Sequence, residues 1–315
     1  MHAPLRIGTR GSELALRQTQ IFIDALHETM PDLPTETVII QTAGDQRTDL
    51  PLCRVNRATG TADKGVFVAT IEEALARGEI DCAVHSCKDM PGVLDERMAL
   101  AAVLPREDVG EALVVRPGAC MHSPTIGTAS VRRVHLAQAF WSGRARTINL
   151  RGNVQTRLRK LVETPGLDAI LLARAGLNRL GYAGCNSVEV QGTVLSIVDL
   201  SCDAFMPALC QGAIVVETRR DDAAVYEIVR RVNHAPSELT IRAERAFLAA
   251  LEADCSVPVA GYASLNGRCM MLRVIYFMPD GLPVRLTLKG DIDHPEALGR
   301  EAAERLAPWR SPNQG

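Results

Sequence analysis

The stretch that decides the fold class is LRIGTRGSELALRQTQIFIDAL, residues 5–26. The apolar run from Leu5 to Gly8 predicts a short strand, and apolar residues at helical spacing between Leu14 and Leu26 predict a helix. Ser12 stands just before that helix, where a hydroxyl side chain serves as an N-cap. The stretch therefore predicts a strand, a polar loop and a helix in succession.

The same unit recurs along the chain. Because strands that alternate with helices of this length favour mainly parallel sheets, we expect an α/β fold with two such modules around a cleft. Ligands of such folds bind beyond the carboxyl ends of the strands. The polar segment 44–65 is too long for a tight connection, and we expect a mobile loop there. Strands are expected at 37–41, 80–85, 125–128, 147–150 and 168–172, and helices at 66–76, 131–140, 154–161 and 175–180.

From about Ala235 the pattern changes. A helix is expected at 239–251, three strands at 257–265, 270–277 and 284–289, and a last helix near the end of the chain. This order predicts a smaller α+β C-terminal domain.

Composition excludes several classes of protein. The 315 residues, 47% of them hydrophobic, suffice for two or three domains. The net charge is −2, from 35 basic and 37 acidic side chains, and aromatic residues make up 4%. Such a chain has no global field to attract nucleic acid or a membrane surface, and few rings on which bases could stack. We therefore expect neither as a partner.

Location and metal content are also constrained. Residues 1–6 lack the apolar run of a secretion signal, and no stretch approaches the roughly 20 apolar residues of a membrane span, so we expect a cytoplasmic protein. The nine cysteines are an odd number and several lie in apolar segments, which favours reduced core thiols. Cys82 and Cys87 have four residues between them and no matching second pair, so we expect no structural metal.

Three expected strand-to-helix loops combine arginine with small hydroxyl or amide residues. Backbone N–H groups at a helix start and a nearby guanidinium together bind a carboxylate or a phosphate. A single such arginine is more often a solvated surface residue, but the repetition predicts a ligand with several anionic groups. The loops contain Arg10 with Ser12, Thr128 with Ser130, Arg132 and Arg133, and Arg151 with Asn153.

Two further positions have both a functional and an ordinary interpretation. Lys88 and Asp89 follow an expected strand, where they either face the cleft or form a surface ion pair. Cys255 lies in an expected helix-to-strand loop, where its thiol could be exposed and reactive, although a loop cysteine is more often incidental.

These segments, in this order, resemble the porphobilinogen deaminase family over nearly the whole chain. Each matching string alone is weak evidence for the resemblance, but ten strings in the same order as in the family are specific evidence for it. The strings are RIGTR (6–10), SELAL (12–16), DKGVF (63–67), HSCKDMP (85–91), GTASVRR (127–133), LRGNV (150–154), AGLNRLG (175–181), QGA (211–213), AERAFL (243–248) and CSVP (255–258).

The resemblance implies three domains and a monomer. The first, at 1–105 and 206–231, is completed by a return segment; the second, at 106–205, is inserted; and the third is at 235–315. The first two would resemble periplasmic binding proteins. The third would carry a dipyrromethane cofactor on Cys255.

The resemblance also implies the reaction. Four porphobilinogen molecules condense head to tail on the covalent dipyrromethane primer, each losing ammonia to give an azafulvenium-like electrophile, and hydrolysis then releases hydroxymethylbilane for tetrapyrrole (haem) biosynthesis. Asp89 matches the catalytic carboxylate, which would stabilise positive charge on pyrrole nitrogens.

The remaining matched positions would bind acetate and propionate groups. Three positions depart from the family pattern, namely Ala129, Arg174 and Ala253-Asp254, and Asp254 could raise the pKa of the Cys255 thiol. The expected cofactor-binding residues are Lys88, Thr128, Ser130, Arg132, Arg133, Arg151 and Asn153, and the expected substrate-binding residues are Arg10, Ser12, Lys64, Arg157 and Arg179.

Two other functions stay open on sequence grounds. A non-catalytic binder of a small polyanion would have the same cation-lined cleft, although Cys255 and the missing export signal favour the enzyme. Nucleic-acid binding by 151–160 is weaker, because Arg157, Arg159 and Lys160 could simply form a solvated helix face.

Overall fold

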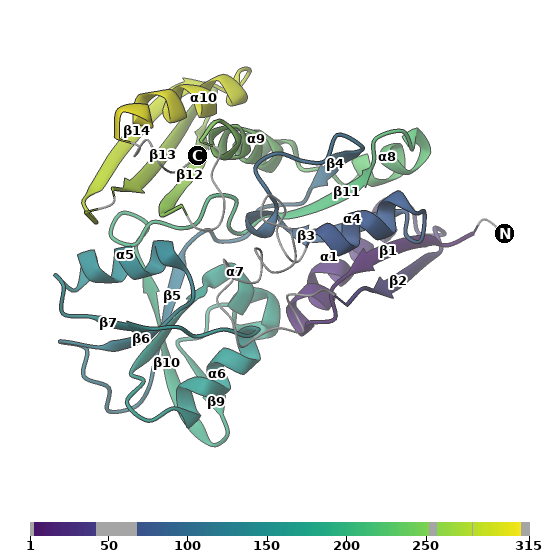
Figure 1. The fold of residues 1–315 in the computed structure, drawn as a ribbon. Coiled ribbons are helices and arrows are strands. Elements are labelled where there is room, and N and C mark those ends of the chain that lie inside the picture. The colour runs from purple at the N-terminus through teal and green to yellow at the C-terminus, as the bar shows by residue number, and fades with distance from the viewer. Residues whose placement is uncertain (1–2, 42–67, 252–256, 279, 310–315) are drawn as a thin grey trace.

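The structure, a computed structural model, describes residues 3–41, 68–251, 257–278 and 280–309. Two mixed sheets and a third antiparallel sheet, each covered by helices, make up this part of the chain (Figure 1). None of its helices is long and apolar enough to cross a membrane. The expected loop at 44–65, Lys64, Asp254 and Cys255 lie outside the described residues.

The first sheet has the strand order β2-β1-β3-β11-β4. β1, β2 and β3 are parallel, and β11 runs antiparallel between β3 and β4, so that β4 points the same way as the first three. The strands are β1 (Leu5–Thr9), β2 (Thr35–Ile39), β3 (Cys82–Ser86), β4 (Met98–Val103) and β11 (Ile214–Arg219).

Helices cover both faces of this sheet, which explains why β3 is almost wholly buried. Successive residues of a strand point to opposite faces. Val84 packs in a cluster with Phe22 of α1 (Glu13–Thr29), whereas Ala83 packs with Ile71 of α4 (Ala69–Ala76). The predicted N-cap of α1 is confirmed, because the Ser12 side chain accepts the Ala15 N–H at 3.3 Å.

The second sheet has the order β7-β6-β8-β5-β10-β9. β6, β7 and β8 are parallel, and β5, β10 and β9 follow in antiparallel pairings. Most strands of each large sheet therefore share one direction, as predicted. The elements are β5 (Glu111–Val115), β6 (Thr125–Gly127), β7 (Arg146–Ile148), β8 (Ala169–Ala173), β9 (Ser187–Val190) and β10 (Thr193–Leu200), with helices α5 (Val131–Phe140), α6 (Val154–Glu163) and α7 (Arg174–Leu177).

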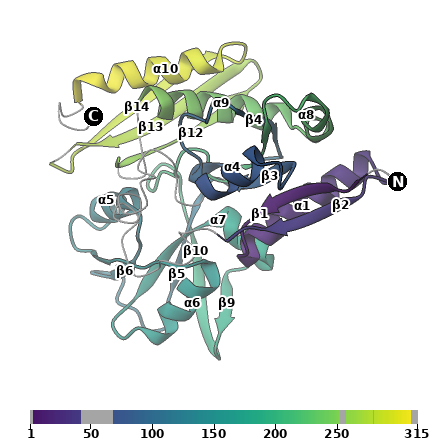
Figure 2. The same ribbon diagram turned by 45° about the vertical axis from the view of Figure 1, so that its right-hand side comes forward.

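The third sheet confirms the predicted smaller α+β unit. Its strands β12 (Val259–Asn266), β13 (Cys269–Phe277) and β14 (Pro283–Asp291) are antiparallel, and α9 (Ala235–Ala250) and α10 (Pro295–Leu306) cover one side (Figure 2). Gly299 allows this packing, because a Cβ atom there would collide with the Ala243 carbonyl oxygen of α9.

Several predicted boundaries need correction. The helix expected at 239–251 begins at Ala235, because His234 caps it and Pro236 fits its first turn. The helix expected at 175–180 is divided into α7 and a short π-type turn, Asn178–Tyr182, in which Gly181 has a φ of +92°. Strands β4, β5, β9, β10 and β11 were not predicted, and α8 (Ala223–Arg230) follows β11 in the return segment.

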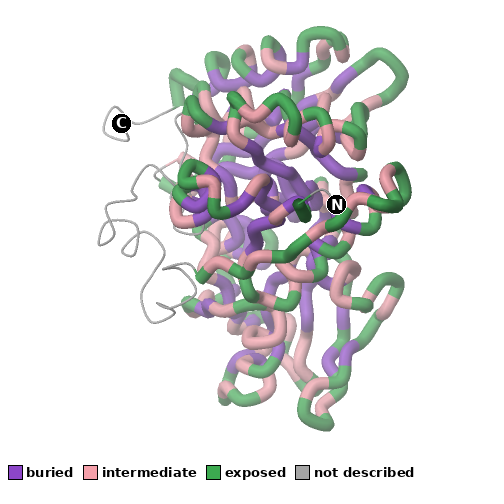
Figure 3. Tube along the Cα trace, turned by 90° about the vertical axis from the view of Figure 1, so that its right-hand side faces the viewer, coloured by how far each residue is buried: buried purple, intermediate pink, exposed green. Residues whose placement is uncertain are grey.

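The chain crosses between the two large sheets twice, between β4 and β5 and again between β10 and β11. The Glu107 N–H donates to the Gly212 carbonyl at 3.1 Å, and the Arg106 Nε donates to the Gln211 carbonyl at 2.9 Å. Gly212 has a φ of +86°, and a Cβ atom there would collide with the Glu107 carbonyl oxygen, so the contact requires glycine. The two connections thus lie against each other at a point where Gly212 is buried and Glu107 is partly exposed. Figure 3 shows buried residues gathered in the interior of the molecule and exposed residues mainly at its outer turns.

Candidate active site

A cavity of about 720 Å³ lies between the first and second sheets. Its wall is built from loops that follow β1, β3, β6, β7 and β8, as expected for an α/β fold. Asp89 is the single acidic residue among the described residues of the wall. The cations of that wall are Arg10, Lys88, Arg133, Arg151, Arg157, Lys160 and Arg179.

Three of the predicted binding residues are helix N-caps. Ser12, Ser130 and Asn153 precede α1, α5 and α6, and their side chains accept N–H groups of the first turn. Such a cap typically stabilises by about 1 kcal/mol. Ser12 and Asn153 also line the cavity, so two helices begin at its wall, where their dipoles favour an anion. Ser130 does not line it, nor does Thr128, whose hydroxyl accepts the Ser130 N–H at 3.2 Å.

Lys88 and Asp89 belong to a short 3₁₀ turn, Cys87–Asp89, directly after β3. Burial lowers the pKa of Lys88 to about 8, although Asp89 opposes that change. The Lys88 Nζ donates to Gln211 Oε1 at 3.2 Å. Asp89 lines the cavity, and within the described part of the chain it forms no ion pair with Lys88 and no hydrogen bond. The interpretation as a surface ion pair is wrong.

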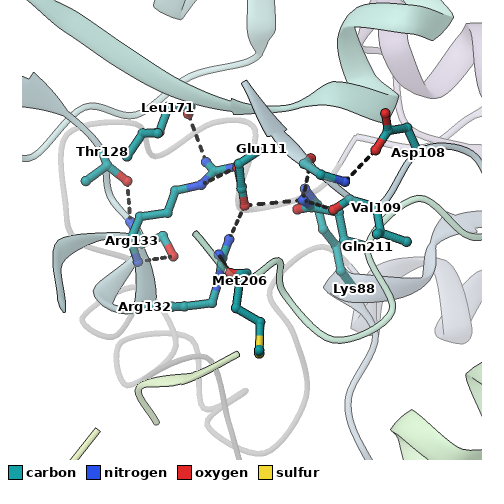
Figure 4. Close-up of polar contacts among 12 residues, drawn as sticks. Lys88, Asp108, Val109, Glu111, Thr128, Arg132, Arg133, Leu171, Met206 and Gln211 are labelled. Carbon is teal, nitrogen blue, oxygen red and sulfur yellow. Dashed lines mark hydrogen bonds and ion pairs between the residues drawn. The ribbon is translucent and has the colours of Figure 1, made fainter. Parts of the chain in front are cut away.

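Arg132 and Arg133 share one buried carboxylate, that of Glu111 (Figure 4). Arg132 reaches Glu111 Oε1 at 2.6 Å and the Met206 carbonyl at 2.8 Å, whereas Arg133 reaches Glu111 Oε2 at 2.7 Å and the Leu171 carbonyl at 2.9 Å. Burial opposes ionisation of Glu111, but the two arginines outweigh it and lower the pKa of the carboxyl to about 2. Arg133 lines the cavity and Arg132 does not.

Arg157 and Arg179 are bound differently. Arg157 Nε donates to the Gly152 carbonyl at 2.7 Å, and Arg179 donates to the Gly212 carbonyl at 2.6 Å. Neither has an ion pair with a carboxylate among the described residues. Burial lowers the pKa of each guanidinium to about 10. Such partly desolvated cations are suited to an anionic ligand, because its charge would compensate theirs.

The wall fits a group with several carboxylates, such as a dipyrromethane that carries acetate and propionate side chains. Among the described residues, seven cations and two helix starts line the cavity, against a single carboxylate. The expected anchor, Cys255, and the expected substrate-binding Lys64 lie outside the described residues.

Sequence reasoning missed several residues at or behind the wall. Gln18 of α1 lines the cavity and bonds Ser86 Oγ at 2.9 Å, and Lys160 also lines it. Glu111 and Gln211 lie behind the wall. Gln211 falls within a matched string, but no sequence pattern identified Glu111. Of the departures from the family pattern, Ala129 lines the cavity, and Arg174 forms an ion pair with Asp199 at 3.4 Å.

Known proteins match the chain almost from end to end. Residues 5–227 match the family described as "Porphobilinogen deaminase, dipyromethane cofactor binding domain", and residues 238–308 match "Porphobilinogen deaminase, C-terminal domain". The porphobilinogen deaminase of Pelotomaculum thermopropionicum is 38% identical over 97% of this chain and 94% of its own length. That of a Roseiflexus species is 41% identical over 97% and 96%.

Solved structures give a weaker likeness. The second substrate binding domain of a putative amino acid ABC transporter from Streptococcus pneumoniae aligns with 73% of this chain and 91% of its own, at 11% identity and a TM-score of 0.40. The two family matches and the relatives together establish that this chain belongs to the porphobilinogen deaminase family and contains its dipyrromethane cofactor-binding domain.

Proposed function

We propose that this chain is a porphobilinogen deaminase that condenses four porphobilinogen molecules on a dipyrromethane primer and then releases hydroxymethylbilane. The observation that carries the proposal is the placement of Asp89, a carboxylate without an ion pair among the described residues, in a cavity lined by cations. A carboxylate there weakens binding of a polyanion. Its presence therefore favours a reaction with a cationic step over mere binding.

The residues have distinct roles in this proposal. Asp89 stabilises the positive charge that develops as ammonia leaves and accepts or donates protons next to the pyrrole nitrogens. The cofactor, when bound to Cys255, supplies a pyrrole with a free α-carbon as the nucleophile. The side chains that bind acetate and propionate groups are Arg10, Ser12, Lys64, Lys88, Arg133, Arg151, Asn153, Arg157, Lys160 and Arg179, with Thr128, Ser130 and Arg132 supporting α5 behind the wall.

The domain division and cellular setting are also proposals. The strand order supports a first domain at 1–105 and 206–231, because β11 lies between β3 and β4. The second sheet supports a second domain at 106–205, and the third sheet supports a third at 235–315. We place the chain in the cytoplasm as a monomer. Free thiols at all seven described cysteines are consistent with a reducing compartment.

Intact-mass analysis of the purified chain, combined with a pyrrole colour reaction, tests the function. We expect a covalent mass increment of dipyrromethane size on the wild-type chain and none on Cys255→Ala, which should also lose activity. An unmodified wild-type chain that binds porphobilinogen reversibly and releases no ammonia would instead identify a non-catalytic binder. An adduct that survives in Cys255→Ala would show that another residue is the anchor.

A further inference from the structure

A buried polar network joins the two connections between the large sheets. Gln211, on the second connection, donates from Nε2 to the carbonyls of Val109 and Gly110 at 2.9 and 3.1 Å and to Glu111 Oε1 at 3.2 Å. Glu111 ends the first connection and begins β5. Gln211 and Glu111 are 0% and 1% exposed, and neither lines the cavity. They therefore do not touch a ligand bound in it.

This network extends to two walls of the cavity. On one side, Gln211 Oε1 accepts a hydrogen bond from the ammonium group of Lys88, in the turn after β3. On the other, Glu111 Oε2 accepts two N–H groups of Arg133 in α5, at 2.7 and 3.1 Å. Figure 4 shows Glu111 between the arginines of α5 and Gln211, with Lys88 beyond Gln211. A continuous hydrogen-bonded chain thus connects a cation of the first sheet to a cation of the second.

We propose that Glu111 and Gln211 are positioning residues, which hold Lys88 and Arg133 at the cavity wall in the geometry that the ligand carboxylates require. This inference rests on the proposed function for its consequence in catalysis, but the placement of Lys88 can be tested without it. Buried charges at a functional site keep a precise geometry only when a second set of hydrogen bonds supports them.

The electrostatics around Lys88 make the proposal measurable. The charged groups that face Lys88 are Asp89 of its own turn, Glu111 of β5, and Arg132 and Arg133 of α5. The two carboxylates raise the pKa of Lys88 and the two arginines lower it. Loss of the Glu111 charge would leave the arginines uncompensated and lower the pKa of Lys88 further below about 8. Loss of the Gln211 acceptor would act in the same direction.

Competitive acetylation of Lys88 as a function of pH, read by peptide mass spectrometry, measures this pKa directly. We expect an apparent pKa near 8 in the wild-type chain, a lower value in Glu111→Gln and Gln211→Met, and the wild-type value in Glu111→Asp, which keeps the charge. A fall of one unit from 8 would make Lys88 react about fivefold faster at pH 7. Glu238→Gln is the matched control, because it breaks a Glu–Arg pair away from the cavity.

Kinetics supply the second measurement. In Glu111→Gln and Gln211→Met we expect KM for porphobilinogen to rise at least fivefold with a smaller change in kcat, and Glu111→Asp to recover most of the affinity. If Glu111→Gln does not fold, Gln211→Met decides, since it keeps the side-chain size and both arginine contacts of Glu111.

Two outcomes are contrary to the proposal. Folded variants in which the labelling profile of Lys88 matches that of Glu238→Gln would show that Glu111 and Gln211 have only a structural role. A rise in the pKa of Lys88 would contradict the electrostatic argument. A wild-type chain without activity would refute the proposed function alone, because the labelling experiment would still report whether the network positions Lys88.

Discussion

Two groups of arginines lie near the cavity, and their partners differ. The arginines of one group bind carboxylates that are 0–1% exposed, whereas those of the other bind only backbone carbonyls within the described residues. The first group is Arg106, Arg132 and Arg133, and the second is Arg157 and Arg179. Among the described residues, an arginine of the first group forms an ion pair with a buried carboxylate, and one of the second group does not. The difference separates cations that a buried carboxylate already neutralises from cations whose charge a ligand would neutralise, and Arg133 belongs to the first group although it also lines the cavity.

The largest effect is expected where a countercharge is removed. Glu244 pairs with Arg106 at 2.6 Å and also accepts the Ala263 N–H at 2.6 Å. Glu244→Gln should lower the free energy of unfolding by about 3–5 kcal/mol, because it leaves a buried guanidinium without a partner charge. Urea denaturation measures this change. Arg242→Gln, which removes an exposed pair with Glu296, should lower the free energy of unfolding by about 0–1 kcal/mol. Equal losses of unfolding free energy in both variants would show that the buried carboxylate partner has no special role in stability.

Asp89→Asn tests the carboxylate of the cavity wall, which has no ion pair among the described residues. The side chain keeps its shape and loses its charge, so turnover should fall by about 10²-fold or more while the free energy of unfolding changes little. Single-turnover rates on protein that already carries the primer exclude defects of primer assembly. Near-normal rates in that assay would remove Asp89 from the catalytic machinery.

Arg157→Met and Arg179→Met test the second group. Each variant loses a charge-assisted contact to the ligand. Binding of porphobilinogen should therefore weaken by about 1.5–3 kcal/mol, which is roughly 10- to 150-fold, or the primer content of the purified chain should fall. Stability should hold or rise, since each variant removes a partly desolvated charge. KM, adduct mass and urea denaturation together check this. Loss of stability with unchanged KM would place these arginines in the structural group.

The pH dependence of Lys88 follows from its pKa of about 8, compared with an ordinary value of 10.5. The ammonium form predominates below pH 8, so affinity for the anionic ligand should fall as pH rises through about 8, by up to tenfold at pH 9.

The free energy of unfolding should change in the opposite direction. Between pH 8 and 10.5 this lysine binds more protons in the unfolded chain than in the folded chain, so its contribution to stability increases as pH rises. Lys88→Arg should abolish the decline in affinity. A decline that persists in this variant would come from another group.

The smallest effect is expected at Arg159, two residues from Arg157 on the same helix. Its guanidinium is exposed and lies 3.7 Å from Glu163 one turn later. Arg159→Gln should change the free energy of unfolding by about 0.3–0.5 kcal/mol and leave KM unchanged. A KM effect equal to that of Arg157→Met would mean that charge on α6, and not its placement in the cavity, determines affinity.

The sequence predicted the β-loop-α units because each is a local pattern of apolar spacing and a cap. It did not predict β4, β5, β9, β10 and β11 of the two large sheets. β10 alternates buried and exposed residues from Val194 to Val198, but two of the exposed residues are valines, so the sequence itself does not alternate between apolar and polar residues. The insertion of β11 between β3 and β4 depends on pairing across more than 100 residues, which no local pattern records.

The same limit applies to the site. Loop position and residue type predicted Arg10, Lys88, Arg133 and Arg151 at the cavity wall, whereas Arg157 and Arg179 were expected only from the family resemblance. Loop position and residue type did not separate Arg132 from the cations of the wall, because its partner Glu111 lies 21 positions away and has no unusual sequence context. Cys255, outside the described residues, stays a prediction that rests on the family resemblance.

The contact at Gly212 has a mechanical consequence. Several hydrogen bonds join the two connections near this glycine and restrict how the two large sheets can move relative to each other. Sliding would stretch the bond between Glu107 and Gly212, whereas a rotation about an axis near that bond would stretch it least. Displacement in a rotation grows with distance from the axis. The rim of the cavity far from Gly212 must therefore widen more than the end beside it whenever the two sheets turn.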